Sequence, residues 1–523
     1  MVKRADNSYA FSQNDISLNT RNIILSNTLL ALVVISKFAL QYHLIADGFE
    51  LHRDEYLHLD QARHLAWGFV SIPPATSFIS WIIYLLGNSV FWVKFFPALF
   101  GTLTIVLVWK SVEALNGGIY ARILAALGTM FSAYLRINTL YQPNSLDILS
   151  WAFLFFCVIK YISTKENKWI YWFAIGFGIG FLNKYNIFFL LAGLIPALLL
   201  TEHRKLFKQR ALYIALGIGL IIIAPNIIWQ FQNGLPVVSH MQELSSGHLI
   251  HVSRISIVLE QIMFFLPSIL VLLFAFIGFI FYKPFKSYRA IVFSFLITLA
   301  LFLYFKGKPY YALGLYPPLF AFGSVYLEYL TKKGLKRYFR PAMILIIIVL
   351  GIIYIPITCP VFSITEMQKN EQVKDFYRKT GQLKWEDGKE HDLPQDFADM
   401  VGWKELAGIV NSVWDTLTDE QKEKTIIFCE NYGQAGATNY YGKEYMGAVS
   451  NHDDYKNWFP QKEIENVILI LGKNRNVPED YTKVFGSVSY IGRIENTASR
   501  ENGTSVYLLS NPSRIVRSEE LRD

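Results

Sequence analysis

The sequence predicts an all-α polytopic membrane protein with a small soluble α/β domain at its C-terminal end. Of the 523 residues, 53% are hydrophobic and only 17% are charged, a balance too apolar for an ordinary soluble enzyme. Several apolar runs reach about 18 residues or more, the length that crosses a bilayer as a helix. Aromatic residues make up 16% of the chain, and such rings favour the two interfaces of a membrane.

The formal net charge of +8 does not indicate nucleic-acid binding. The lysines and arginines concentrate in short loops between apolar runs, where positive charge fixes the orientation of the spans. The three cysteines, Cys157, Cys359 and Cys429, are too far apart for a metal-ligand motif or a disulfide framework. We therefore expect membrane lipids among the partners of this chain, and no nucleic acid.

The apolar pattern divides the chain into three parts. Residues 1–22 are polar and basic, which predicts a cytoplasmic N-terminal segment followed by an uncleaved first span. Residues 23–358 predict a transmembrane domain of about eleven spans. These spans are expected at about 23–45, 90–112, 119–136, 146–164, 169–183, 186–201, 211–230, 257–281, 290–305, 309–330 and 341–358. Residues 359–523 predict an extracytoplasmic α/β domain.

Two stretches between the first spans are expected at the membrane surface. Residues 54–68 have the apolar spacing of an amphipathic helix that lies on the interface. Residues 75–87 are too few to span and follow Pro73-Pro74, so an interfacial or re-entrant piece is expected there.

Residues with catalytic potential fall in loops that alternation places on the outer side, opposite the most basic loops. The first outer loop contains two adjacent carboxylates, Asp54 and Glu55, which supply a general base or a cation ligand at the membrane surface. The other candidate residues in the outer loops are Arg53, Tyr56, Asp147, Lys184, His240, Lys306, Lys308, Tyr310 and Tyr311. Simpler roles remain open, with Asp147 as a helix cap and Lys184 as a lysine that extends to the headgroups.

This combination of residues predicts group transfer from a lipid phosphate. Lysines at the membrane edge would hold a phosphate or pyrophosphate, and a carboxylate would deprotonate the attacking hydroxyl of the acceptor. Tyr56, Tyr310 and Tyr311 would stack on a sugar, although interfacial anchoring is the commoner use of tyrosine. The alternative is a transporter or flippase of lipid-linked sugars, but such proteins bury ionisable groups near the bilayer midplane, whereas these spans look nearly free of charge.

The C-terminal part shows short apolar runs and one amphipathic helix. Residues 425–429, 467–471 and 506–509 are expected as buried strands, and residues 403–417 as the helix. Residues 431–436 follow the first of these strands and resemble a phosphate-binding loop only loosely. A plain strand-to-helix turn is the favoured interpretation.

A set of short motifs, in order along residues 20–355, resembles a known family. They are Arg53-Asp54-Glu55-Tyr56, Ala62 to Gly68, Pro73-Pro74, Gln142-Pro143, Asp147, Leu182 to Tyr185, Pro225-Asn226, Trp229-Gln230, Asn233-Gly234, Lys308 to Tyr311 and Tyr316-Pro317. This pattern is similar to the bacterial branch of the protein O-mannosyltransferase superfamily, glycosyltransferases of family 39 type with the GT-C fold that are related to the lipid A aminoarabinose transferase.

The resemblance implies an enzyme of the cell (inner) membrane that moves a sugar from a polyprenyl-phosphate carrier to an extracytoplasmic acceptor, with inversion. It assigns the first-loop acids to Asp54 and Glu55, with Asp54 as the base, and the second acid to Asp147. Lys184 would meet the carrier phosphate, and Lys308 matches a basic position before the tyrosines. The acceptor remains open between lipid, glycan and protein. A divalent metal ion remains open as cofactor, with His240 and Glu243 as the candidate ligands.

Overall fold

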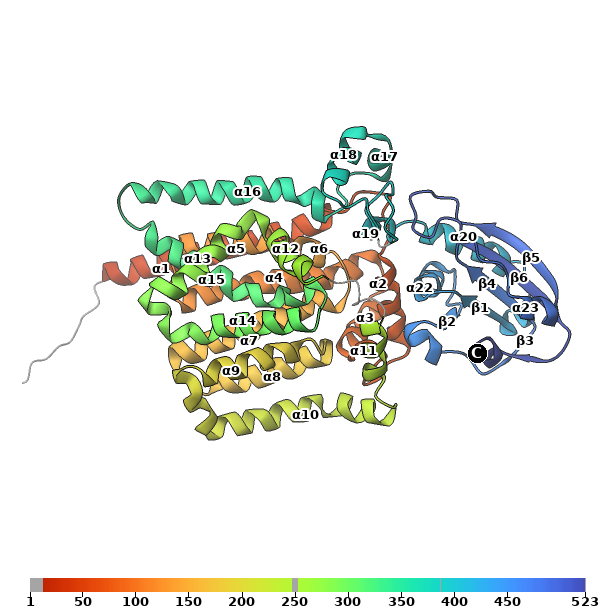
Figure 1. Cartoon of the computed structure of the whole chain (residues 1–523), viewed down its shortest axis with the longest axis horizontal. Helices are drawn as coiled ribbons and strands as arrows, with labels where there is room; N and C mark the ends of the chain where they lie inside the picture. Colours follow the sequence, from red (N-terminus) through yellow and green to blue (C-terminus); the bar gives the residue numbers. More distant parts are fainter. Residues whose placement is uncertain (1–12, 247–252, 386, 523) are drawn as a thin grey trace, which may run out of the picture.

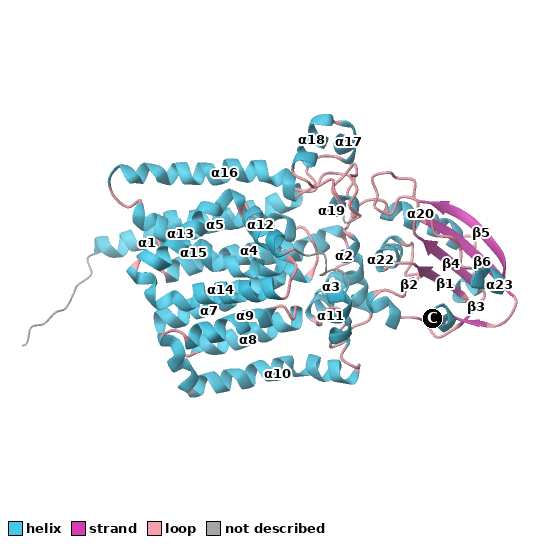
Figure 2. Cartoon of the chain, viewed as in Figure 1, coloured by secondary structure: helices cyan, strands magenta, loops and turns pink. Residues whose placement is uncertain are grey.

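The computed structural model describes residues 13–246, 253–385 and 387–522. Long helices run side by side along the molecule, and an α/β domain covers one end of this bundle (Figure 1). The strands lie in the C-terminal domain, whereas the bundle is helical (Figure 2). The predicted fold class is therefore confirmed.

Each of the eleven predicted spans contains a helix. The bundle consists of α1 (Gln13–His43), α4 (Val90–Ala114), α5 (Ile119–Met130), α7 (Pro143–Thr164), α8 (Lys168–Asn183), α9 (Ile187–Leu199), α10 (Arg210–Gln232), α12 (Arg254–Phe264), α13 (Ile269–Phe281), α14 (Arg289–Tyr304), α15 (Tyr316–Leu330) and α16 (Phe339–Thr358). Within the described residues, six helical segments are long and apolar enough to cross a membrane, or eight if each of two bent pairs is one span. The chain is a multi-pass membrane protein whose helices are partly shorter than predicted.

The shortening has local causes. The predicted span 257–281 is bent by 65° between α12 and α13, where Pro267 occupies the break. The predicted span 119–136 ends at Met130 and is followed by the short helix α6 (Tyr134–Ile137). The predicted span 309–330 begins as a 3₁₀ segment, η5 (Pro309–Leu315), before α15 starts.

Three further helices, α2 (Arg53–Asp60), α3 (Ala75–Leu85) and α11 (Pro236–Ser246), lie at the end of the bundle that faces the C-terminal domain (Figure 1). The sequence predicted an interfacial helix over 54–68, but α2 ends at Asp60. All of its residues from Glu55 onward are buried. The physical reason is that the C-terminal helix α22 packs on α2, so this apolar face meets protein instead of lipid.

The C-terminal domain has a five-stranded sheet of order β2-β1-β4-β6-β5. Its strands are β1 (Thr425–Cys429), β2 (Val449–Ser450), β4 (Asn466–Leu471), β5 (Phe485–Arg493) and β6 (Ser505–Pro512), and β3 (Glu463–Ile464) pairs separately with β7 (Val516–Arg517). Strand β1 runs parallel to β2 and β4, whereas β6 is antiparallel to β4 and β5. The three strands predicted from the sequence are confirmed.

The helices of this domain are α17 (Ile364–Lys369), α18 (Glu371–Lys379), α19 (Gln395–Ala398), α20 (Trp403–Trp414), α21 (Asp419–Glu423), α22 (Tyr432–Tyr441) and α23 (Glu479–Val484). Helix α20 confirms the predicted amphipathic helix. Helices α20 and α22 lie on the side of the sheet that faces the bundle (Figure 1). They therefore form the layer through which the domain contacts α2.

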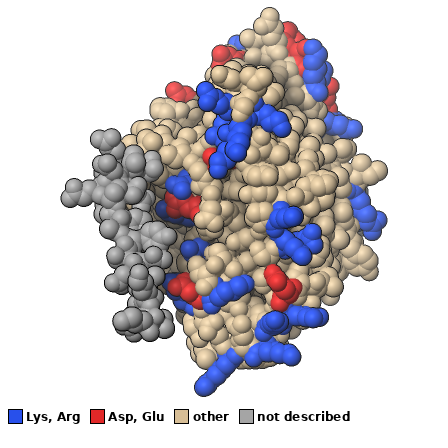
Figure 3. Space-filling model, turned by 90° about the vertical axis from the view of Figure 1, so that its left-hand side faces the viewer, with Lys and Arg blue, Asp and Glu red and all other residues tan. Residues whose placement is uncertain are grey.

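The opposite end of the bundle is basic. Figure 3 views this end and shows more lysine and arginine than acidic residues on its surface. The loops that contribute there include residues 160–168, 203–210, 283–289 and 332–337. Basic loops and candidate site loops thus occupy opposite ends of the molecule.

The bundle is less free of charge than its sequence pattern indicated. Lys37 in α1 is only 1% exposed and donates a hydrogen bond to Gln41, which in turn donates to the Leu135 carbonyl at 3.1 Å. Lys94 in α4 is paired with Glu55. Both lysines are satisfied by fixed partners, since an unpaired charge inside the bundle would be costly.

Candidate active site

The two adjacent acids of the first predicted outer loop point to different places. Glu55 is fully buried, and its carboxylate accepts hydrogen bonds from Lys94 Nζ at 2.7 Å, from Tyr141 N at 2.6 Å and from His52 N at 2.7 Å. The last of these bonds completes a capping box at the start of α2, where His52 is the N-cap. Glu55 therefore ties three segments together and has no free surface for a substrate.

Asp54 is the accessible member of the pair, with a side chain that is 36% exposed. Its Oδ1 accepts a hydrogen bond from the Tyr432 hydroxyl at 2.7 Å, and its Oδ2 accepts one from Gln142 Nε2 at 3.1 Å. Burial raises the pKa of Asp54, but the neighbouring His52, the Tyr432 hydroxyl and Arg53 outweigh it and hold the pKa below its ordinary value. The carboxylate is thus ionised at neutral pH.

A chain of amides connects Asp54 with Lys184. Gln142 donates to Asp54, Asn144 Nδ2 donates to Gln142 Oε1 at 2.8 Å, and Lys184 Nζ donates to Asn144 Oδ1 at 2.6 Å. Both amides stand at the start of α7, whose first turn begins at Pro143. A carboxylate and an ammonium group are therefore held apart by two side chains of one rigid helix end.

Asp147 lies one turn further into α7 and does not cap the helix. The N-cap is Gln142, and the Asp147 carboxylate accepts hydrogen bonds from Trp151 Nε1 and Asn186 Nδ2, both at 2.9 Å. Asp147 is 4% exposed and interacts electrostatically with Lys184. The cap interpretation is wrong, because the side chain points across the bundle and not back along its own helix.

Lys184 is surrounded by aromatic rings and a second cation. Its ammonium group lies 4.8 Å from the ring centre of Tyr311 and 5.2 Å from that of Tyr310. Burial lowers the pKa of Lys184, Asp147 opposes this, and Lys308 lowers the pKa further. The Lys308 side chain has no hydrogen-bond or ion-pair partner among the described residues. Lys184 and Lys308 interact electrostatically, and an anion bound by two such cations would relieve their repulsion.

Two of the predicted binding residues have other surroundings. Tyr56 is fully buried, with its ring 5.8 Å from that of Trp403 and 5.6 Å from that of Tyr440, so it has no surface for a sugar. Arg53 lies over the Tyr432 ring at 4.7 Å and 3.9 Å from Asp399. Both residues join the bundle to the C-terminal domain. The buried Tyr56 does not fit a substrate contact, whereas the Arg53 side chain is 16% exposed and its contact with substrate stays a prediction.

Lys306 and His240 lie outside the hydrogen-bond chain that connects Asp54 with Lys184. Lys306 takes the left-handed conformation that ends α14. Burial lowers the pKa of His240, which interacts with Asp453 of the C-terminal domain, with Glu243 and with Lys308. Within the described ranges, no three His, Cys, Asp or Glu side chains are grouped to hold a metal ion. His240 and Glu243 interact with one another, and a metal ion held by them stays a prediction.

Motif residues that are distant in the sequence are hydrogen-bonded to one another next to the turn that carries Lys184. Asn226 Nδ2 donates to the Trp67 carbonyl at 2.6 Å, while its Oδ1 accepts from the Tyr185 hydroxyl at 3.0 Å. Gln230 Nε2 donates to the same hydroxyl at 2.9 Å. These bonds fix the turn that carries Lys184 against α10 and against the loop after α2.

The C-terminal domain contacts the first two outer loops through charged side chains. Arg136 Nε donates to Asp396 Oδ2 at 2.6 Å, and His52 Nε2 lies 3.3 Å from Asp396 Oδ1. Asp399 accepts a hydrogen bond from Arg500 Nη1 at 2.9 Å. The domain is thereby anchored next to Asp54.

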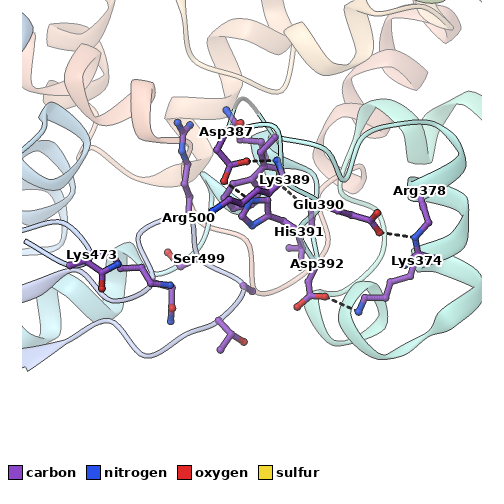
Figure 4. Close-up of a pocket in the computed structure, with 17 residues that line it drawn as sticks. Lys374, Arg378, Asp387, Lys389, Glu390, His391, Asp392, Lys473, Ser499 and Arg500 are labelled. Carbon is purple, nitrogen blue, oxygen red and sulfur yellow. Dashed lines mark hydrogen bonds and ion pairs between the residues drawn. The ribbon is translucent and has the colours of Figure 1, made fainter.

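Arg500 also borders a polar recess of about 860 Å³ in the C-terminal domain. Figure 4 shows its rim, where Glu390 is paired with Arg378 and Asp392 with Lys374, each at 2.7 Å. This recess lies outside the cluster formed by Asp54, Gln142 and Lys184. The contact of Arg500 with Asp399 connects it with the surroundings of His52.

The sequence pattern did not single out four residues of the candidate site. Lys94 falls within a predicted apolar span, although a lysine in the first turns of a span is a signal for a nearby acid. Gln142 appears only within a family motif, and Asn144 only as its neighbour in the loop. Tyr432 lies in residues 431–436, which the sequence predicts as a strand-to-helix turn. In the structure Asn431 caps α22, and residues 432–436 form its first turns. Only the tertiary fold brings the start of this helix to Asp54.

Comparisons with known proteins give this geometry a family context. Residues 71–229 match the family described as dolichyl-phosphate-mannose-protein mannosyltransferase. Lipid A galacturonosyltransferase RgtD from Rhizobium johnstonii is 23% identical over 232 residues. The match covers 39% of this chain and 46% of RgtD, so it spans less than half the length of this curated relative.

The fold is similar to that of ArnT from Cupriavidus metallidurans. The crystal structure of ArnT bound to undecaprenyl phosphate matches with a TM-score of 0.58 at 12% identity, and the apo structure with 0.58 at 14%. Both alignments cover 94% of this chain and 98% of ArnT. The family match and the ArnT-like fold confirm the predicted resemblance.

Proposed function

Taking this chain as a GT-C glycosyltransferase, we propose that it transfers a sugar from a polyprenyl-phosphate donor to an extracytoplasmic acceptor with inversion. Asp54 is the general base, and Lys184 and Lys308 hold the donor phosphate. The observation that carries this proposal is the amide chain through Gln142 and Asn144. It keeps an accessible carboxylate and a buried ammonium group at a fixed separation, as a displacement between acceptor and phosphate requires.

The reaction is a single displacement at the anomeric carbon. The acceptor oxygen forms a bond to that carbon as its proton passes to Asp54, and the bond from the carbon to the phosphate oxygen breaks. The departing phosphate keeps the electron pair, and its growing negative charge is stabilised by Lys184 and Lys308. One displacement inverts the anomeric configuration.

The two acids have separate tasks in this scheme. Asp54 stays deprotonated at neutral pH because its pKa is lowered, and it is exposed enough to meet an acceptor hydroxyl. Asp147 is buried and provides the opposite charge that holds Lys184 in place when no phosphate is bound. Glu55 positions Asp54 through the capping box and through Tyr141 of the second loop.

The donor class and the orientation are supported by the relatives and by charge. ArnT was crystallised with undecaprenyl phosphate, and the matched family is named for a dolichyl-phosphate sugar donor. The basic end of the bundle corresponds to the cytoplasmic side by the positive-inside rule. Asp54 and the C-terminal domain then lie on the extracytoplasmic side of the inner membrane, where acceptors of lipid, glycan or protein type are found.

The test is sugar transfer in cell-envelope membranes that contain the protein. A panel of radiolabelled undecaprenyl-phosphate hexoses and pentoses is supplied, and label in lipid, glycan and protein fractions is counted. Asp54→Asn is expected to lower transfer by about 10²–10⁴-fold, the usual contribution of a general base. Asp480→Asn is the control, because Asp480 lies 90% exposed on α23.

Two outcomes would overturn the proposal. Full transfer by the Asp54→Asn protein would remove the base assignment. Movement of labelled donor across proteoliposomes without transfer to any acceptor would favour a flippase.

A further inference from the structure

One tyrosine of the C-terminal domain contacts the candidate base directly. Tyr432, at the start of α22, donates its hydroxyl hydrogen to Asp54 Oδ1 at 2.7 Å, although the two residues are 378 positions apart. We propose that Tyr432 is a positioning residue for Asp54 and that the C-terminal domain is thereby a working part of the active site. This inference rests on the proposed function, in which Asp54 is the base.

Tyr432 is held by a contact to the face of its ring and by the capped start of its helix. The guanidinium group of Arg53 lies over its face at 4.7 Å. The preceding residue, Asn431, accepts hydrogen bonds from Gly433 N at 2.9 Å and Gln434 N at 3.1 Å, and its amide donates to Glu501 at 3.2 Å. The direction of the hydroxyl is therefore set by a capped helix and not by a mobile loop.

Two glycines bring α22 close enough to α2 for this contact. A Cβ on Gly433 would lie 3.2 Å from Arg53 Cβ, and a Cβ on Gly436 would lie 2.7 Å from Tyr56 Cβ. Glycines at this spacing occupy one face of the helix. The feature that resembled a phosphate loop in the sequence thus serves close packing of two helices.

The hydroxyl fixes the plane of the base. Tyr432 occupies one oxygen of the carboxylate and Gln142 the other, which stops rotation of the group and leaves the remaining lone pairs in defined directions. A base that is already oriented needs no further ordering when the acceptor arrives. Without the hydroxyl, Asp54 keeps one of these two anchors.

The hydroxyl also stabilises the ionised form of Asp54. The charged or titratable groups that act on Asp54 are His52, Arg53 and His58 from its own segment, Tyr432 from α22 and Tyr310 from η5. Removing a donor to a carboxylate raises its pKa, so the base becomes protonated at a higher pH. The other groups that act on the pKa of Asp54 remain in place when only this hydroxyl is lost.

The experiment compares Tyr432→Phe with the unaltered protein in the transfer assay. We expect kcat to fall about tenfold, the donor KM to change by less than about twofold, and the acid limb of the pH profile to move up by about one unit. Phenylalanine retains the ring on Arg53, and the Tm of the purified protein checks that the fold is kept.

Tyr440→Phe is the matched control. The Tyr440 hydroxyl also reaches from α22 to the bundle, donating to the Asn88 carbonyl at 2.9 Å, but it does not contact Asp54. A structural contribution alone would affect both variants alike and leave the pH profile unmoved. An unshifted acid limb in Tyr432→Phe would overturn the inference. If Asp54→Asn is inactive at the same time, the proposed function stands; if Asp54→Asn is active, both fail.

Discussion

The two acids at the catalytic end of the molecule differ in what holds them. Asp54 is partly exposed and bound by Gln142 of the bundle and by Tyr432 of the C-terminal domain. Asp147 is buried, and its two hydrogen-bond donors, Trp151 and Asn186, belong to the bundle alone. The difference indicates a division of work. In the proposed mechanism, the bundle by itself builds the phosphate end of the site, whereas the base is completed by the docked domain.

The largest effect is expected when Glu55 is replaced by alanine, which breaks the hydrogen bonds that join the segments containing Asp54 and Asp147. Lys94 would be left as a buried charge without its partner, a loss of about 3–5 kcal/mol in the free energy of unfolding. Thermal unfolding in detergent measures it. The double variant Glu55→Ala/Lys94→Met removes both charges and should recover part of the Tm. An unchanged Tm in the single variant would contradict this role of Glu55.

Replacing Lys184 by methionine should disable the phosphate end and spare the base. We expect the donor KM to rise about 10–100-fold, because one of two cations that face the phosphate is lost, while the acid limb of the pH profile stays in place. Initial rates at varied donor concentration measure this. Lys332→Met at the opposite basic end is the control. A normal donor KM for Lys184→Met would remove Lys184 from the phosphate site.

Gly436→Ala should disturb the base and spare the phosphate end. The new methyl group would lie 2.7 Å from Tyr56 Cβ and from the Tyr455 hydroxyl, which forces α22 away from α2. We expect a lower Tm and about tenfold slower transfer with an unchanged donor KM. Gly408→Ala in α20 is the matched control, since its Cβ meets nothing within 4 Å and should slightly raise the Tm. Equal Tm changes in both variants would contradict the close-packing role.

The smallest expected effect concerns how stability depends on pH at the contact between the bundle and the C-terminal domain. Burial raises the pKa of Asp60 from 3.8 to about 7, against hydrogen bonds from Tyr455 and Asn439. From about pH 4 to pH 7 the folded protein therefore binds more protons than the unfolded chain, so this contribution to stability is lost as the pH rises. Asp60→Asn should make Tm less dependent on pH between about 4 and 7. An equally steep dependence in the variant would exclude Asp60 as its source.

Much of the fold follows from local patterns. Each apolar run became a helix, and residues 425–429 form β1 as predicted, because period and length act within a single element. The prediction that failed concerns what surrounds a helix, not the helix itself. The apolar face of α2 suits a membrane surface as well as a protein surface, and only the position of α22 decides between them.

The site was predictable as a set of residues but not as an arrangement. The pair Asp54-Glu55 is visible in the sequence, yet its division into one free and one buried acid depends on Lys94 and Tyr141, which come from other helices and loops. Tyr432 gave no signal of its own. Its partner lies in another domain, and the neighbouring glycines were equally compatible with a turn.

The amide chain between base and phosphate site has a fixed polarity. Lysine can only donate and a carboxylate can only accept, so Asn144 must present its oxygen to Lys184, and Gln142 its nitrogen to Asp54. Amides in this arrangement do not ionise, and they act as an insulating spacer. If Asp54 is the base as proposed, the proton that it gains in each turnover returns to bulk water through the exposed edge of the carboxylate, and the ammonium group stays charged through every cycle.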